Sequence, residues 1–161
     1  MGKLKLSLPL EETAIRALLP HQGEMCLIDR LSQWSPEQAV CESSAHLRPA
    51  HPLSGETRLG SASLIEVAAQ AMALHGALLG SASDAQQAQP DAEQKHGVLA
   101  GVRKVVLHEA NIALIDAPLR VDVTLSSGDS NTALYAFDVS ANGQSLASGR
   151  ATVLFTTQPQ P

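Results

Sequence analysis

The chain has 161 residues, a formal net charge of −5, 44% hydrophobic residues and only 2% aromatic residues. An acidic chain with so few rings has no global attraction for nucleic acid or anionic lipid, and it offers little surface on which bases or sugars could stack. Its two cysteines are too few for a disulfide scaffold. We expect one globular domain over residues 1–161. Because residues 1–10 lack the apolar core and cleavage site of a signal peptide, we expect it in the cytoplasm.

Apolar periodicity and turn-forming residues predict the elements in chain order. They are a helix at 14–19 that Pro20 stops, strands at 25–31 and 39–46, a loop at 47–60, a long helix at 61–79, a polar loop at 81–95, and strands at 98–107, 119–125, 132–140 and 144–155. The Asn142–Gly143 pair predicts a hairpin between the last two strands.

The stretch 61–79 is the clearest element, because it is Ala-rich and apolar around most of its circumference. Such a helix belongs in a core, and we expect Gly80 to end it. Glu66, Gln70 and His75 interrupt its apolar surface, so we do not expect it to span a membrane. One apolar helix followed by an antiparallel meander favours an α+β fold, in which the sheet could wrap around the helix.

Glu66 is the most unusual residue of this helix. Steps of three and four residues place Ser63, Glu66 and Gln70 on one stripe. A carboxylate on a buried helix is costly unless it is paired, solvated in a cleft or protonated, and such a group suits general acid–base chemistry. The alternative is a structural carboxylate that caps nearby loop amides.

Two of the six histidines, His46 and His51, flank the loop that leads into this helix. We favour His51 as a functional residue, because His46 ends a predicted strand and its side chain could face solvent. We expect His75 to lie in the core or on the surface and His21 to form local hydrogen bonds. No H-x-x-x-H or C-x-x-C pattern occurs, so we expect no metal site.

These motifs, in this order, resemble the hotdog-fold 3-hydroxyacyl-carrier-protein dehydratases. Residues 19–30 read L-P-H-Q-G-E-M-C-L-I-D-R, similar to their opening L-P-H-x-x-x-x-L-(L/V)-D-R, and residues 64–71 read L-I-E-V-A-A-Q-A, similar to their L-x-E-A-x-A-Q helix. Residues 50–53, A-H-P-L, stand where the family has G-H-F-P. The closer resemblance is to the ApeP-like dehydratases of aryl-polyene clusters, whose P-H-x-G-x-M-x-L-(L/I)-D and A-Q-A-x-A-x-H-G-x-L patterns recur at 20–29 and 69–78.

The resemblance implies a hotdog fold, in which an antiparallel sheet wraps around one long central helix. It implies dehydration of a 3-hydroxyacyl thioester to the trans-2-enoyl thioester, in fatty-acid-like or aryl-polyene biosynthesis, with His51 and Glu66 as catalytic residues. The resemblance also places four residues at the substrate: Gly60, Ser61, Ala62 and Gln70.

No metal or diffusible cofactor is implied, because the substrate arrives on the phosphopantetheine of acyl carrier protein. The family usually forms dimers, so we expect a homodimer or a heterodimer with another hotdog subunit. The acidic carrier protein needs a local basic patch, for which the candidates are Arg48, Arg58, Arg103, Lys104 and Arg150.

The chain departs from the family pattern at two places. His51 precedes Glu66 by 15 positions, one more than in the family's loop, and Gly60–Ser61 replaces P-G before the helix. Two alternatives therefore stay open. The chain could be a hotdog thioesterase that uses Glu66 to activate water, or a non-catalytic subunit that completes a heterodimer with a catalytic hotdog chain.

Overall fold

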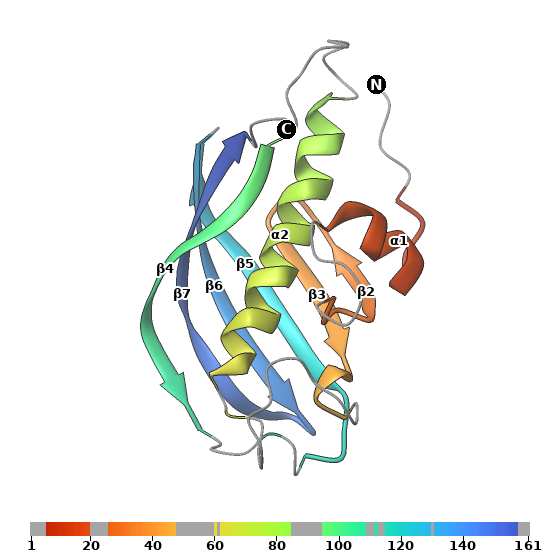
Figure 1. Ribbon diagram of the computed structural model, residues 1–161, viewed down its shortest axis with the longest axis vertical. Coiled ribbons are helices and arrows are strands. Elements are labelled where there is room, and N and C mark those ends of the chain that lie inside the picture. Colours follow the sequence, from red (N-terminus) through yellow and green to blue (C-terminus); the bar gives the residue numbers. More distant parts are fainter. Residues whose placement is uncertain are drawn as a thin grey trace.

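A seven-stranded antiparallel sheet curves around one long helix, α2 (Ser63–Asp84), as Figure 1 shows. The computed structural model describes residues 6–19, 26–47, 60, 62–84, 95–108, 112, 115–129 and 131–157. The strand order is β1-β2-β3-β5-β6-β7-β4, and helix α1 (Glu12–Leu18) packs at one side against α2 and β2. This arrangement confirms the predicted α+β fold with the sheet wrapped around the helix.

The strands differ strongly in length, from two residues at one edge of the sheet to 13 at the other. Their bounds are β1 (Leu10–Glu11), β2 (Arg30–Trp34), β3 (Gln38–Ser43), β4 (Lys95–Leu107), β5 (Leu119–Gly128), β6 (Thr132–Ala141) and β7 (Gln144–Thr157). The turn between β6 and β7 is formed by Asn142 and Gly143, which both have positive φ angles, 51° and 76°. Two such residues define the tight turn that matches the twist of a hairpin, so the predicted hairpin is confirmed.

The core lies between the concave face of the sheet and α2. Alternate residues of β6 are buried there, among them Tyr135, Phe137 and Val139, as the two-residue period of a strand requires. Small α2 residues such as Ala68 and Ala71, both fully buried, let the strands come close to the helix. The Ala-rich composition of the helix is therefore what allows the sheet to curve around it.

Several predicted boundaries are wrong, among them boundaries of three elements in the first half of the chain. Helix α2 continues to Asp84, so Gly80 does not end it. A glycine inside a helix costs only about 1 kcal/mol relative to alanine, which packing elsewhere offsets. The strand predicted at 25–31 begins only at Arg30 and continues to Trp34. The strand predicted at 39–46 ends at Ser43 and is followed by a 3₁₀ turn, Ala45–Leu47.

By length and hydropathy alone, residues Ser63–Ser81 of α2 could cross a membrane, with a mean hydropathy of 1.3. Half of this window is buried against the rest of the chain. Figure 1 shows the same helix at the centre of the curved sheet. The core helix of a globular domain has this composition too, so the window is weak support for a membrane span.

Candidate active site

Glu66 lies in the first turn of α2, and its side chain is half-buried. Gly60 lies just before this turn. Its carbonyl accepts two hydrogen bonds from Ser63, one from the N–H at 3.1 Å and one from the side-chain Oγ at 2.7 Å. The next bond runs from the N–H of Ile65 to the carbonyl of Ala62, at 3.1 Å. A negative charge near the N-terminus of a helix is favoured by the helix dipole. The carboxylate and the first amide groups of α2 therefore lie at the same end of the helix.

The structure brings three of the predicted site residues together at this end: Gly60, Ala62 and Glu66. Within the described part of the chain, no residue accepts a hydrogen bond from the N–H of Ala62, whose side chain is exposed. His51 and Ser61 lie outside the described residues. So do His21 and two of the basic candidates, Arg48 and Arg58.

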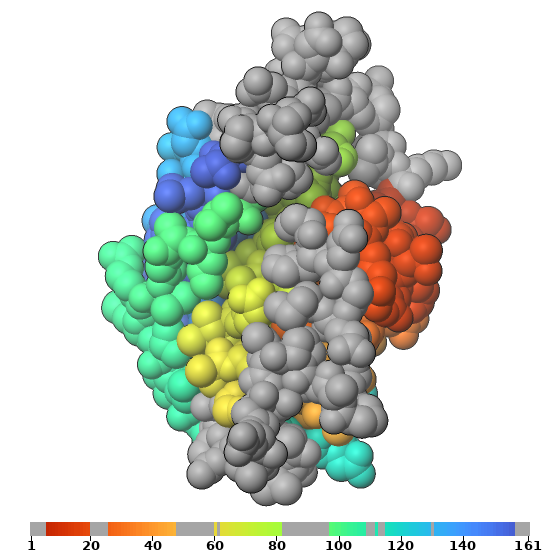
Figure 2. Space-filling model, viewed as in Figure 1, coloured from red at the N-terminus to blue at the C-terminus, as the bar shows by residue number. Residues whose placement is uncertain are grey.

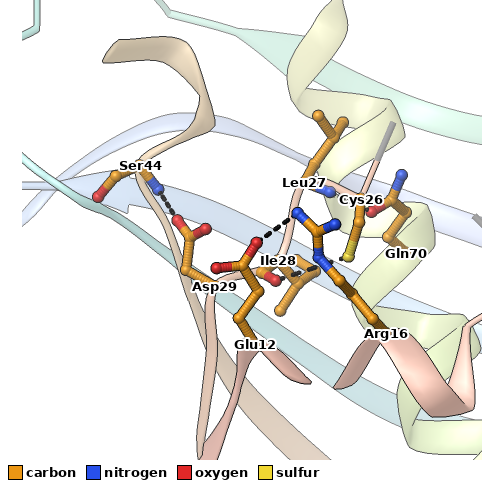
Figure 3. A network of polar contacts seen from close by, with 8 residues as sticks. All are labelled: Glu12, Arg16, Cys26, Leu27, Ile28, Asp29, Ser44 and Gln70. Atoms are coloured by element: carbon orange, nitrogen blue, oxygen red, sulfur yellow. Dashed lines mark hydrogen bonds and ion pairs between the residues drawn. The ribbon is translucent and has the colours of Figure 1, made fainter. Parts of the chain in front are cut away.

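Gln70 lies one helical turn after Glu66 but is fully buried. Its Oε1 accepts a hydrogen bond of 2.7 Å from the N–H of Leu27, as Figure 3 shows. The hydroxyl of Ser43 donates to the carbonyl of the same residue, Leu27. The segment 26–29 is therefore tied to α2 on one side and to the end of β3 on the other. The contact of Gln70 with substrate stays a prediction, since its described bond is internal to the chain.

Asp29 ties the same segment to the start of the 3₁₀ turn. Its carboxylate accepts a hydrogen bond from the N–H of Ser44, as Figure 3 shows. The N–H of Asp29 donates to the carbonyl of Glu42 at 2.9 Å. The ion pair of Glu12 and Arg16 on α1 lies beside this segment in the same view. Asp29 and Gln70, which both belong to the motifs of the family resemblance, thus fix the backbone at two neighbouring points.

The prediction for His46 was wrong. This side chain lies in the 3₁₀ turn with only 5% of its surface exposed, and it neither ends a strand nor faces solvent. Its Nε2 lies 3.0 Å from the carbonyl of Ile115. A carbonyl can only accept a hydrogen bond, so Nε2 carries the proton. The Nδ1 atom is buried and has no partner among the described residues.

His75 is fully buried in the core, which the sequence left as one of two possibilities. Its Nε2 donates to the carbonyl of Ser35 at 2.9 Å, so its Nδ1 accepts from the hydroxyl of Tyr135 at 2.8 Å. Burial lowers the pKa of His75 and raises the pKa of Tyr135, so both groups are uncharged at neutral pH. The ring of Trp34 lies 5.9 Å from the imidazole, between centroids.

The polar cluster around His75 was missed at the level of the sequence. The chain has one tryptophan and one tyrosine, and both contact this histidine. The signal was the H-G pair inside the A-Q-A-x-A-x-H-G-x-L pattern, but nothing in the local sequence says which strands lie opposite. In the part of the chain that the structure describes, no group of three or more histidine, cysteine or acidic side chains could hold a metal ion.

A sheet curved around one central helix, with a carboxylate in the first turn of that helix, defines a hotdog-fold protein. Solved structures share this fold. The dehydratase heterocomplex ApeI:P from Xenorhabdus doucetiae matches with a TM-score of 0.72 at 21% identity, over 91% of each chain. A thioesterase from Pseudomonas aeruginosa matches with a TM-score of 0.55 at 13% identity, over 80% of this chain and 81% of that one. A hypothetical thioesterase with coenzyme A from Streptococcus pneumoniae gives 0.56 at 14% identity, over 81% and 87%.

The family model of the ApeP dehydratases matches residues 13–160, which is nearly the whole chain. The chain therefore belongs to the ApeP-like dehydratase family, as its motifs predicted. No curated protein matches it in sequence. Family and fold together place the chain among the hotdog dehydratases.

Proposed function

We propose that the chain dehydrates a 3-hydroxyacyl group held as a phosphopantetheine thioester on acyl carrier protein, in fatty-acid-like or aryl-polyene biosynthesis. His51 takes a proton from C2, and Glu66 binds the C3 hydroxyl and assists its departure. The C2 proton and the C3 hydroxyl leave together as one water, and a trans double bond forms between C2 and C3. Backbone N–H groups near Ser61 and Ala62 polarise the thioester carbonyl.

Membership in the ApeP-like dehydratase family is the observation that carries this proposal. The position of Glu66 supports it, because this half-buried carboxylate lies in the first turn of α2, at the end of the helix that carries its first amide groups. The thioester itself acidifies the C2 proton, so the reaction needs no metal or diffusible cofactor. A single domain over residues 1–161 and a cytoplasmic location remain predictions.

Incubation of the purified chain with a carrier-bound 3-hydroxyacyl substrate, followed by mass spectrometry of the carrier, tests the reaction. A loss of the mass of one water supports the dehydratase. The matched control is Glu66→Gln, which keeps the shape of the side chain and should lower the rate by about 10² or more. Turnover at the wild-type rate in this variant would remove Glu66 from the mechanism.

The choice of histidine is tested by a pair of substitutions, His51→Ala and His46→Ala, assayed at equal concentrations of folded protein. We expect the first to abolish dehydration. His46 is buried and anchored to Ile115, so we expect its loss to lower stability rather than the rate per folded molecule. The opposite pattern would assign the acid–base role to His46.

A thioesterase is the second candidate, and it is favoured by hotdog structures described as thioesterases. In this reaction Glu66 activates a water that attacks the thioester carbonyl. The same mass spectrum distinguishes the two reactions, because a thioesterase releases a free acid and leaves an empty carrier.

A second hotdog subunit is the proposed partner. The sheet ends at the 13-residue strand β4, whose outer edge is unpaired among the described residues. Such an edge is a template for another strand, and a hotdog partner could continue the sheet there. Sedimentation showing a stable monomer of 16.9 kDa at micromolar concentration would contradict this proposal.

The neighbouring ApeI:P structure is a heterocomplex of dehydratases, which supports a heterodimer as one form of that partnership. If the pure chain makes neither product but gains activity when a cognate hotdog subunit is added, it is the non-catalytic or partner-dependent member. Glu66→Gln in this chain, tested in the complex, then shows which subunit supplies the carboxylate.

A further inference from the structure

The outer face of the sheet, on the side away from α2, carries charged side chains on neighbouring strands, and on β1, β2, β3 and β5 these side chains form ion pairs. The register aligns Glu11, Arg30, Glu42 and Arg120 across β1, β2, β3 and β5, so the charges alternate in sign. Arg30 lies 3.3 Å from Glu11 and 3.9 Å from Glu42. Arg120 binds Asp122 at 2.9 Å. On this half of the face, each arginine has a neighbouring carboxylate.

The opposite end of the same face is different. Arg103 on β4 lies directly across from Arg150 on β7, and both side chains are exposed. Lys104 follows at a bulge, with a positive φ of 52°. No carboxylate among the described residues forms an ion pair with any of the three. Like charges directly opposite each other on paired strands repel, so this cluster weakens the fold locally.

Exposed apolar side chains flank the basic cluster. Val98 and Leu154 lie opposite each other in the β4–β7 register and are 52% and 42% exposed. Val106, beyond the bulge, is 47% exposed. The alternation of β7 places this set on the outer face, because Ala151 and Val153, which alternate with Arg150 and Leu154, are buried. Basic and apolar groups side by side fit a partner that offers acidic and apolar groups together.

The position of this surface relates it to the candidate site. Figure 1 shows the C-terminal end of β4 and the N-terminal end of α2 at the same end of the molecule. In Figure 2 the green surface of β4 lies beside the yellow surface of the first turns of α2. A protein bound on the outer face of β4 and β7 would therefore sit near the end of the molecule that carries Glu66.

We propose that the outer face of β4 and β7, centred on Arg103 and Arg150, is the docking site for an acidic, amphipathic segment of the protein that carries the acyl substrate. This inference rests on the proposed function. A carrier must bind and leave in every catalytic cycle, and exposed charges suit that task because they speed association without locking the complex. Since no described carboxylate forms an ion pair with this basic cluster, its positive charge is available to such a partner.

The test compares two double variants that lower the net charge equally. Arg103→Gln/Arg150→Gln removes the proposed docking charges, and Arg30→Gln/Arg120→Gln removes two arginines that have carboxylate partners. Each protein is assayed with a 3-hydroxyacyl group on acyl carrier protein and with the same group on free pantetheine. We expect the docking variant to raise KM for the carrier substrate about tenfold, to weaken its salt dependence and to leave kcat/KM for the pantetheine substrate within about twofold.

The control variant should behave as the wild type with both substrates. An unchanged KM for the carrier substrate in the docking variant would overturn the proposal. Unfolding in urea provides a second check, since removal of the repelling pair should leave the docking variant at least as stable as the wild type.

The binding of acyl carrier protein alone separates this proposal from the proposed function. If no protein turns over either substrate, the dehydratase assignment fails, but a roughly tenfold weaker binding of the carrier by the docking variant still supports the docking site. Equal binding by all variants overturns it. If the docking variant loses association with a hotdog subunit and keeps carrier binding, the surface belongs to the subunit interface and the proposal is wrong.

Discussion

Replacing Tyr135 with phenylalanine directly tests the buried bond between β6 and α2. The substitution keeps the ring and removes only the hydroxyl that donates to Nδ1 of His75. Because His75 is 0% and Tyr135 2% exposed, water cannot replace the lost donor. A buried acceptor left without a partner costs about 1–3 kcal/mol. The bond from His75 to Ser35 remains and the hydroxyl no longer has to be desolvated, so we expect a loss of about 1–2 kcal/mol.

For a domain of this size, that loss corresponds to a decrease in Tm of about 2–8 °C. Urea unfolding measures it, and a double-mutant cycle with His75→Leu isolates the pair. In the His75→Leu background the Tyr135→Phe substitution should be neutral or stabilising, because no acceptor remains for the hydroxyl. A loss below about 0.5 kcal/mol in the wild-type background, or equal losses in both backgrounds, would refute the bond as the cause.

Three further predictions concern stability. Below a pH of about 6.5, His75 binds a proton in the unfolded chain but not in the folded core, where burial lowers its pKa. The free energy of unfolding should therefore fall by up to about 1.4 kcal/mol for each unit of decreasing pH, until the pH reaches the lowered pKa of the folded state. The His75→Leu variant should show a flatter dependence of stability on pH in this range. Gly149→Ala should lower the free energy of unfolding by about 1–3 kcal/mol, because the added Cβ would lie 3.0 Å from an aromatic ring atom on β6 and 3.2 Å from the backbone of β4. The control is Gly80→Ala, whose Cβ would meet nothing within 4 Å and which should stabilise the helix by about 0.5–1 kcal/mol. Thermal unfolding measures both changes. Gln70→Met should speed amide exchange at Leu27 by at least tenfold, and unchanged exchange would show that the Gln70 bond does not hold this segment.

The C-terminal half of the sheet was predictable because its signals are local. β5 and β6 alternate apolar and polar residues, and the Asn142–Gly143 pair takes the backbone conformation that a tight hairpin requires. The long helix was equally clear from its apolar length, although its end was not. Gly80 has open space around it, so no contact forces the chain to turn there.

The N-terminal half was less predictable because distant residues decide its backbone. The apolar run at 25–31 has strand-like composition, but residues 26–29 are held by the side chains of Gln70 and Ser43 and by one backbone bond to the end of β3, and they form no strand. Leu27 and Gln70 are 43 positions apart, and no local pattern reports such a bond. His46 was misjudged for a similar reason, since its partner, Ile115, is 69 positions away.

The two motifs that carry the family resemblance meet in the structure at one point. Gln70 follows Glu66 by one helical turn, and its bond to Leu27 fixes that part of α2 against the segment that ends in Asp29. Asp29 in turn holds Ser44, at the entry to the turn that contains His46. A shift of segment 26–29 would therefore move the first turns of α2 relative to the end of β3. The polar residues of the two motifs differ in their positions. Glu66 is half-buried in the first turn of α2, and Gln70 and Asp29 hold the segment 26–29 against that helix and against the start of the 3₁₀ turn.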